Sequence, residues 1–254
     1  DNLLPGVDTD LVKVVEKHLR KGSVDVHLGT KAVSAKLVDG GAEVTIEKNG
    51  AQQTLACDKV LVAVGFKPNS QGLGLEKAGV KLDPRGHVAV DGQFRTNVPS
   101  VYAIGDVKGP PYLAHKASKE AELAAEIIAG HKAGVDYPTI PAAIFTHPEI
   151  ATVGLSEAAA KAQGKKIRVG KFPFAASGRA MAVSETDGFI KVIVDEDDHQ
   201  VLGVGIVGPE ASDLISEAAL AIEMSAFAED VALTIHPHPT LGESVGMAAE
   251  VYEG

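Results

Sequence analysis

The 254-residue sequence contains one cysteine and no tryptophan, and aromatic residues make up only 4% of the chain. With Cys57 alone, neither an intrachain disulfide nor a cluster of cysteine metal ligands can form. Because aromatic side chains are scarce, the core must consist mainly of Ala, Val, Ile and Leu. An apolar fraction of 45% and a charged fraction of 23% are typical of globular domains and not of disordered or fibrous chains.

Positive charge and long apolar runs are also scarce. The 24 Lys and Arg residues are outnumbered by 34 acidic residues, and the net charge of −10 argues against nucleic acid or an anionic membrane surface as the main partner. No apolar run approaches the roughly 20 residues that span a bilayer, and no signal peptide opens the chain. These features predict a cytoplasmic protein that binds neither nucleic acid nor membrane.

The first part of the chain has an α/β pattern. It predicts helices at residues 8–21, with Asp8 as N-cap, and 114–129, and strands at residues 24–28, 32–37, 43–47 and 53–55. Continuous apolar runs at residues 59–65 and 100–106 are typical of strands buried on both faces of a parallel sheet. Two prolines and a lack of periodicity at residues 134–141 indicate a domain boundary.

The second part, residues 142–254, has an α+β pattern. Strands are expected at residues 142–146, 151–154, 166–174, 189–195 and 200–207, and helices at residues 156–163, 211–224 and 243–250. The two later helical segments carry broad apolar stripes, and one domain of this size is expected to be too small to bury both. A two-fold pairing of identical surfaces would bury the remainder, so we expect a homodimer.

A literal Gly-x-Gly-x-x-Gly motif occupies residues 203–208. In a dinucleotide site such glycines follow a strand and lead into a helix whose N-terminus receives the pyrophosphate. Here the glycines lie inside a strand pattern, and Pro209 follows them. We therefore interpret the motif as a closely approached strand and not as a cofactor loop.

Two neighbouring features do indicate a ligand site. The apolar run that ends in Gly105 and Asp106 would let the backbone approach a ligand closely and point a carboxylate at it, although an ordinary strand with an Asp turn is the alternative. Seven residues later, Leu113, Ala114 and His115 open the long helix, whose N-terminus is a preformed site for anions and dipoles.

The most specific signal is the segment 235–243, which contains His236, His238 and Glu243. A carboxylate at position 243 can accept the proton of one His238 nitrogen and leave the other nitrogen facing a substrate, which makes an acid–base pair. The alternatives are a satisfied histidine at a helix start, or His236 and His238 as two metal ligands. No third ligand with plausible spacing is evident, so we predict no metal site.

In this order the motifs resemble those of the class I pyridine nucleotide-disulfide oxidoreductases, especially their dihydrolipoamide dehydrogenase branch. The resemblance runs along essentially the whole chain and includes residues 145–154, 172–180 and 228–235. The additional His236 beside His238 resembles the lipoamide branch and not the glutathione branch. The mercuric branch lacks the His238 and Glu243 pair.

The resemblance implies a fold and a set of site residues. Residues 1–71 would form a partial Rossmann-like NAD-binding domain, residues 72–141 a returning segment of the FAD-binding domain, and residues 142–254 a complete α+β interface domain. The implied catalytic residues are His238 and Glu243, the FAD contacts are Gly105, Asp106, Leu113, Ala114 and His115, and the NAD contacts are Gly65 and, more weakly, Ala32. The family usually has Arg after this glycine, whereas this chain has Phe66, so no cation contact is carried over.

The implied reaction oxidises dihydrolipoamide to lipoamide through a redox disulfide and FAD, with hydride passed to NAD. The implied partners are a second copy of the chain and components of a 2-oxo acid dehydrogenase complex. The family's N-terminal glycine-rich flavin loop and its Cys-x-x-x-x-Cys do not occur in this sequence. We therefore expect the C-terminal part of a longer enzyme, inactive by itself. Two alternatives are another disulfide reductase of the same family and a non-catalytic dimerisation module.

Overall fold

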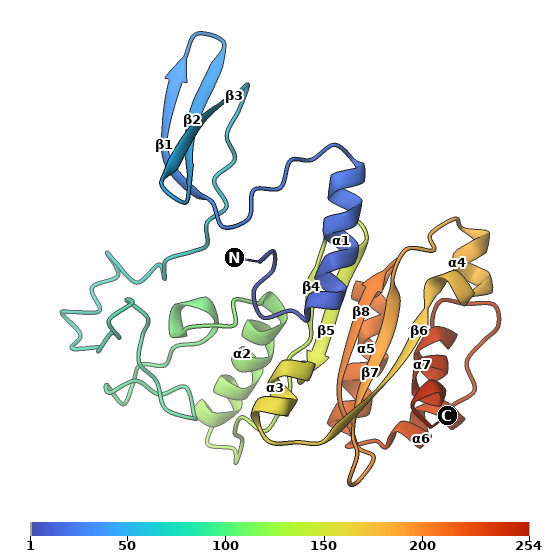
Figure 1. Ribbon diagram of the computed structural model, residues 1–254. Helices are drawn as coiled ribbons and strands as arrows, with labels where there is room; N and C mark the ends of the chain where they lie inside the picture. Colours follow the sequence, from blue (N-terminus) through green and yellow to red (C-terminus); the bar gives the residue numbers. More distant parts are fainter. Residues whose placement is uncertain (1, 254) are drawn as a thin grey trace. The chain divides into compact units, whose positions relative to one another are not determined.

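The computed structural model describes residues 2–253, the last of them by its backbone only. The chain forms two compact units (Figure 1). The first unit combines the residues up to Val60 with those from Pro138 onward, and the second consists of Leu61–Tyr137. Among the residues that the structure describes, no helix is long and apolar enough to cross a membrane.

The first unit opens with a helix and a small antiparallel sheet. The elements are α1 (Thr9–Lys21), β1 (Lys31–Val38), β2 (Gly41–Lys48) and β3 (Ala51–Cys57). Asn49 and Gly50 both have positive φ, as a two-residue hairpin turn between twisted strands requires, and the expected hairpin is confirmed. The strand expected at residues 24–28 does not form.

A five-stranded antiparallel sheet in the order β4-β5-β8-β7-β6 forms the centre of the first unit. Its strands are β4 (Ala142–Ile144), β5 (Glu149–Gly154), β6 (Ile167–Pro173), β7 (Phe189–Asp195) and β8 (Val201–Gly208). The helices that follow or connect them are α3 (Glu157–Ala162), α4 (Gly178–Ala182), α5 (Ala211–Glu223), α6 (Ala228–Leu233) and α7 (Glu243–Glu253). The α+β pattern predicted for this part is confirmed, although α4 and α6 were not expected.

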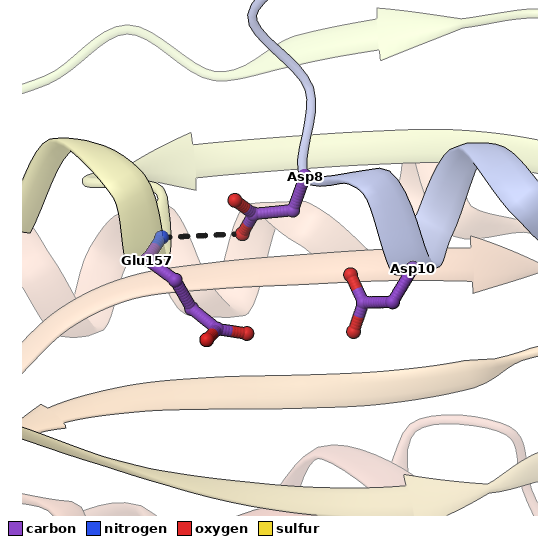
Figure 2. Close-up of side chains that lie close together, drawn as sticks. All are labelled: Asp8, Asp10 and Glu157. Carbon is purple, nitrogen blue, oxygen red and sulfur yellow. Dashed lines mark hydrogen bonds between the residues drawn. The ribbon is translucent and has the colours of Figure 1, made fainter.

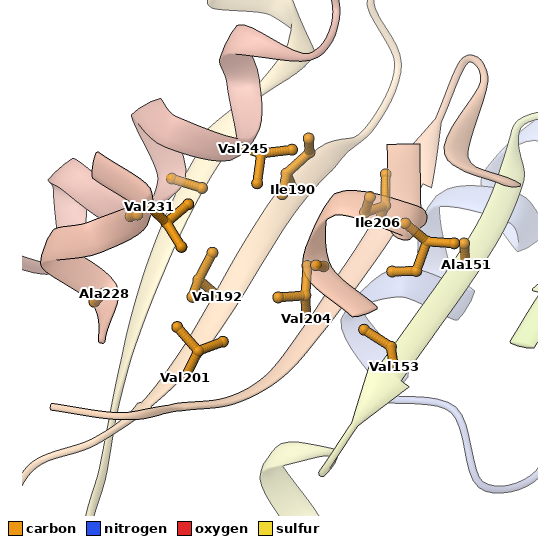
Figure 3. Packing of buried hydrophobic residues seen from close by; sticks show 14 of the residues in the cluster. Ala151, Val153, Ile190, Val192, Val201, Val204, Ile206, Ala228, Val231 and Val245 are labelled. Atoms are coloured by element: carbon orange, nitrogen blue, oxygen red, sulfur yellow. The ribbon is translucent and has the colours of Figure 1, made fainter. Parts of the chain in front are cut away.

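Successive side chains of each strand point to opposite faces of the sheet. Val192 and Val204 point into a core that also contains Ile215 of α5 and Ala248 of α7 (Figure 3). The apolar stripes of α5 and α7 therefore pack largely into one core, but Met247 and Val251 of the α7 stripe remain 38% and 52% exposed, so part of that stripe is uncovered in the single chain. Interdigitation of β-branched and alanine side chains makes this possible without any tryptophan.

On the opposite face of the sheet, α1 packs Leu11 and Val15 against Ile150 and Val207. The glycines of the literal motif at 203–208 lie inside β8, and Leu11 of α1 closes over Gly205 so tightly that an added Cβ would meet it. The motif is a place of close packing, which confirms its interpretation as a closely approached strand.

The second unit contains little regular structure. Its helices are the 3₁₀ turn η1 (Gly105–Lys108) and α2 (Ala114–Ile128). The buried strand expected at residues 59–65 is wrong, since Leu61 and Val64 are each 91% exposed. The run at residues 100–106 makes one isolated bridge, between Arg95 and Tyr102. Apolar composition indicates that a segment can be buried, but a strand also needs neighbouring strands, and among residues 2–253 neither run belongs to a sheet.

Candidate functional site

The two residues of the predicted acid–base pair lie in contact at the start of the last helix. The Nδ1 atom of His238 lies 2.8 Å from Oε2 of Glu243. With the carboxylate accepting from Nδ1–H, the Nε2 atom is left as a proton acceptor. The His238 side chain is 77% exposed, whereas the Glu243 side chain is 12% exposed. The pair therefore presents one imidazole nitrogen outward and holds the other against a nearly buried carboxylate.

Local structure around this pair explains its geometry. The Thr240 hydroxyl donates to the Pro237 carbonyl over 2.7 Å and closes the turn that contains His238. Glu243 is the first residue of α7, where the positive end of the helix dipole favours an ionised carboxylate. The chain from turn to helix thus brings the two side chains together over five residues.

His236 has a different role. Its Nε2 atom lies 2.6 Å from Oε1 of Glu217 in α5, and its Nδ1 atom lies 2.8 Å from the Thr234 carbonyl. The ring also packs on Gly246 of α7, where an added Cβ would lie 3.0 Å from two ring atoms. Because both nitrogens have partners, His236 is an anchor between α5 and α7, and the interpretation of His236 and His238 as paired metal ligands loses its geometric basis. Glu217 was missed because it lies 19 residues away.

The predicted flavin residues lie in the second unit. Gly105 is buried and has φ of +69°, and an added Cβ would lie 3.1 Å from the Cβ of Ala117 in α2. Its N–H donates to Oε2 of Glu120 over 2.7 Å. Only glycine combines this backbone conformation with so close an approach to a helix. Asp106, the next residue, is exposed in the first turn of η1.

The beginning of α2 has the chemistry of an acceptor site. Leu113 stands at the N-cap in extended conformation, and its side chain makes no capping hydrogen bond. No acidic residue occupies the first turn, which begins with Ala114 and His115. The first amides and the positive helix end are thus not neutralised by a side-chain cap or a carboxylate of that turn. Such a donor set fits the carbonyl and anionic groups of a flavin nucleotide.

The predicted NAD contacts fall in different units. Gly65 of the second unit has φ of +103°, and an added Cβ would meet nothing within 4 Å. Phe66, which replaces the family's usual Arg, makes an edge contact with Tyr112 at 6.4 Å between ring centroids. Ala32 of the first unit pairs with Ile46 across the hairpin sheet.

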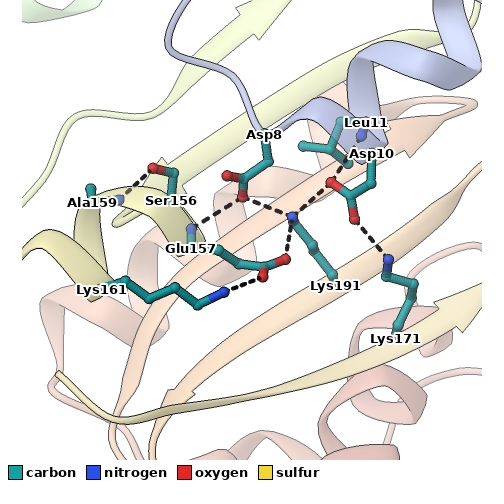
Figure 4. A network of polar contacts seen from close by, with 9 residues as sticks. All are labelled: Asp8, Asp10, Leu11, Ser156, Glu157, Ala159, Lys161, Lys171 and Lys191. Atoms are coloured by element: carbon teal, nitrogen blue, oxygen red, sulfur yellow. Dashed lines mark hydrogen bonds and ion pairs between the residues drawn. The ribbon is translucent and has the colours of Figure 1, made fainter.

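Three carboxylates come together outside these predicted sites. Carboxylate oxygens of Asp8, Asp10 and Glu157 lie within 4.8 Å of one another (Figure 2), a spacing that could hold a metal ion. The buried ammonium of Lys191 lies among them, at 2.7 Å from Asp8, 2.8 Å from Asp10 and 3.0 Å from Glu157 (Figure 4). A protein cation thus already satisfies the cluster, and Asp8 uses its side chain here and not to cap α1.

The network keeps Lys191 charged although it is buried. Burial by itself would lower the pKa of Lys191, but hydrogen bonds with Asp10, Asp8 and Glu157 outweigh that effect and raise it. Because Lys191 belongs to β7, Asp10 to α1 and Glu157 to α3, the network ties both helices to the sheet. Its role is structural.

Two family models match successive parts of the chain. The model for pyridine nucleotide-disulphide oxidoreductases matches residues 1–121, and the model for the dimerisation domain of the same proteins matches residues 140–249. The chain belongs to the pyridine nucleotide-disulphide oxidoreductase family. The mixed α/β and α+β fold class predicted from the sequence agrees with this membership.

Curated relatives in this family are similar along the entire chain. The chain is 49% identical over 252 residues to dihydrolipoyl dehydrogenase of Geobacillus stearothermophilus and 50% identical over 256 aligned positions to that of Bacillus subtilis (strain 168). These matches cover 99% and 100% of the chain and 54% of each relative. The chain therefore spans about half the length of the curated relatives it matches.

Solved structures with the same fold include two bacterial proteins. LpdA from Mycobacterium tuberculosis superimposes with a TM-score of 0.90 at 30% identity, covering 98% of the chain and 54% of that structure. The HOCl-induced flavoprotein disulfide reductase RclA from Escherichia coli superimposes with a TM-score of 0.89 at 25% identity, covering 97% of the chain and 56% of that structure.

Proposed function

We propose that the chain is part of a dihydrolipoyl dehydrogenase and supplies its acid–base pair. The observation that carries the proposal is the 2.8 Å contact between His238 and Glu243, with the other face of the imidazole exposed. The identity of 48–50% to relatives named dihydrolipoyl dehydrogenase supports the same substrate. The full-length enzyme of this proposal is a polypeptide that contains this chain and the half of the relatives' length that it does not span.

The proposed chemistry begins with a proton. The Nε2 atom of His238 accepts the proton of one dihydrolipoamide thiol, and Glu243 stabilises the resulting imidazolium. The thiolate attacks one sulfur of a redox disulfide, whose S–S bond breaks as a mixed disulfide forms. The second thiol then closes the lipoamide ring and leaves the enzyme as a dithiol. That disulfide must come from outside this chain, which contains only Cys57.

The electron pair leaves through the cofactors. When bound, FAD would supply the two-electron redox chemistry that connects the dithiol with NAD. We propose that Gly105 and Asp106 contact the flavin nucleotide from η1, that Leu113, Ala114 and His115 contact it from α2, and that Gly65 and Ala32 contact NAD. Residues 1–71 and 72–141 would be the corresponding parts of the NAD and FAD domains. The start of α2, where the Leu113 side chain makes no capping hydrogen bond, supports the flavin assignment.

The preferred substrate distinguishes a dihydrolipoyl dehydrogenase from another disulfide reductase of the family. The full-length enzyme should reduce NAD with dihydrolipoamide and should turn over glutathione disulfide poorly. A preference for glutathione disulfide would contradict the substrate but not the family. The same proposal includes association of the full-length enzyme with components of a 2-oxo acid dehydrogenase complex. This part rests on the resemblance.

We also propose that two copies pair through residues 142–254. The matched dimerisation domain supports pairing, and several apolar side chains of the segment 220–235 are uncovered in the single chain. Leu220 is 62% exposed, Met224 71%, Leu233 74% and Ile235 96%. These residues differ from the stripes expected from the sequence, of which Met247 and Val251 also stay exposed, at 38% and 52%.

Sedimentation at micromolar concentration should show the 254-residue chain at twice its 26.3 kDa mass. Replacing Leu220 and Met224 together by Glu should shift the equilibrium to monomer, because charges at a paired apolar surface lose their hydration. Met181→Glu, at a residue 54% exposed in α4, is the matched control and should remain dimeric. A monomer of the unsubstituted chain would contradict pairing through this domain alone.

The 254-residue chain by itself should not retain FAD after purification. Asp106 and the start of α2 supply one wall of a flavin site, and the Gly-x-Gly-x-x-Gly motif of the chain lies inside β8, where it cannot hold a pyrophosphate. Absorbance near 450 nm, about the flavin maximum, measures retention, with the full-length enzyme as control. Stoichiometric flavin in the 254-residue protein would contradict this expectation.

A further inference from the structure

Glu120 of α2 is a fully buried carboxylate in the second unit. Its Oε2 atom accepts the Gly105 N–H over 2.7 Å, and its Oε1 atom lies 2.9 Å from the Lys108 ammonium and 3.7 Å from that of Lys116. Burial, with a smaller contribution from the same carboxylate, raises the pKa of Tyr137. A buried charge is retained only where it is paired and hydrogen-bonded, and here the bonded backbone group directly precedes Asp106.

Lys116, one helical turn before Glu120, secures the other end of the same turn. It is 3% exposed, and its ammonium donates to the Gly109 carbonyl over 2.9 Å. Burial lowers the pKa of Lys116 even though Glu120 acts against that shift. The two side chains therefore attach both ends of η1, at Gly105 and Gly109, to the helix behind it.

The chain between η1 and α2 is held from its other side as well. The Tyr112 hydroxyl lies 2.8 Å from Nε2 of buried His87, whose Nδ1 lies 3.0 Å from Asp83. Only residues 110–112 separate Gly109 from Leu113, so these contacts leave little freedom between the turn that presents Asp106 and the helix start.

We propose that Glu120 and Lys116 are positioning residues for the flavin site: they set the place of Asp106 relative to the N-terminus of α2. The identity of the ligand in this proposal rests on the proposed function. The geometry rests on the contacts of Glu120 and Lys116. Both side chains are buried and bind backbone groups of the protein. Both act through the Gly105–Lys108 turn, so removing either should weaken what Asp106 contributes to binding.

The first test measures hydrogen exchange by mass spectrometry in the 254-residue chain, which needs no cofactor. Glu120→Ala should speed exchange in the peptide that contains Gly105 and Gly109 about 10-fold, the effect of losing one hydrogen bond of about 1.4 kcal/mol. Glu120→Gln keeps an acceptor and should restore much of the protection. Glu122→Gln is the matched control, because that side chain is 68% exposed and forms a surface ion pair with Lys119. Unchanged exchange in Glu120→Ala would overturn the proposal.

The second test is a double-mutant cycle for FAD affinity in the full-length enzyme. Asp106→Asn should weaken binding about 10-fold or more, and the same change should cost less than about 3-fold once Glu120 is Ala. If Glu120→Ala does not fold, Lys116→Met takes its place in the cycle. If the loss of FAD affinity in the double variant equals the product of the losses in the two single variants, Glu120 only stabilises the unit, and the proposal is overturned. Absence of FAD from the unsubstituted full-length enzyme would instead contradict the proposed function. Hydrogen exchange in the 254-residue chain would still decide whether Glu120 holds the turn.

Discussion

Replacing His238 by Gln in the full-length enzyme should slow the oxidation of dihydrolipoamide by about 100-fold or more, the usual contribution of a general acid–base group. A Gln amide can still donate to Glu243, so the turn closed by Thr240 should keep its geometry. It cannot accept a thiol proton at neutral pH, and the fraction of substrate present as thiolate then limits the rate. Steady-state turnover with NAD measures the effect.

A second activity separates catalysis from folding in this variant. Oxidation of NADH by an artificial acceptor that bypasses the disulfide needs no thiol proton, so it should survive largely intact. His147→Gln is the matched control, because His147 also faces a carboxylate, Glu185 at 4.0 Å, on the exposed surface. It should leave both activities unchanged. Equal loss of both activities in His238→Gln would place His238 in folding or flavin binding.

Replacing Lys191 by Met should lower the free energy of unfolding by about 3 kcal/mol, because it removes the one cation that three neighbouring carboxylates share. The loss should appear as a lower midpoint in urea with an unchanged slope. Lys166→Met is the matched control: its ion pair with Asp197 is 3.5 Å long and both side chains are 71% exposed, so it should change stability by less than about 0.5 kcal/mol. Equal midpoints for the two variants would contradict the structural role of the network.

The pH dependence of this difference follows from the pKa shifts. Burial would raise the pKa values of Asp10 and Glu157, but hydrogen bonds with Lys171 and Lys191 for Asp10, and with Lys191 and Lys161 for Glu157, lower them. Their stabilisation is therefore present above the ordinary carboxyl range near pH 4 and is lost as the pH falls. The raised pKa of Lys191 keeps its contribution complete below about pH 10 and loses it above the folded value. The gap between Lys191→Met and the unsubstituted chain should thus be widest between about pH 5 and 10 and narrow towards pH 3; a constant gap would contradict the assignment.

Short-range features could be predicted from the sequence because their partners are close along the chain. His238 and Glu243 lie five residues apart across one turn and one helix start, so local rules were sufficient to pair them. The same holds for the hairpin at Asn49 and Gly50 and for the α+β order after residue 142. The contact of His236 with Glu217 could not be found in this way, since nothing local connects a loop histidine to a particular helical turn.

Buried ion pairs could not be predicted from the sequence either, whether they lie near the candidate flavin site or in the sheet. Lys116 and Glu120 have helical i, i+4 spacing, which by itself is typical of a solvated surface pair; only the packing of η1 on α2 turns them into buried contacts for Gly105 and Gly109. Lys191 sits in an apolar strand pattern, and the acids that neutralise it lie 34 to 183 positions away.

Residue order and periodicity were enough to predict the element types of the second half of the chain, the contact of His238 with Glu243 and the family, because each depends on side chains that meet within a turn or alternate along a strand. Which apolar surfaces are covered depended on the tertiary structure. The run at residues 59–65 has the composition of a buried strand but no ladder partner among the described residues, whereas the stripes of α5 and α7 share one core that their sequences did not predict. Burial is a property of two surfaces in contact, and the sequence of one surface does not specify the other.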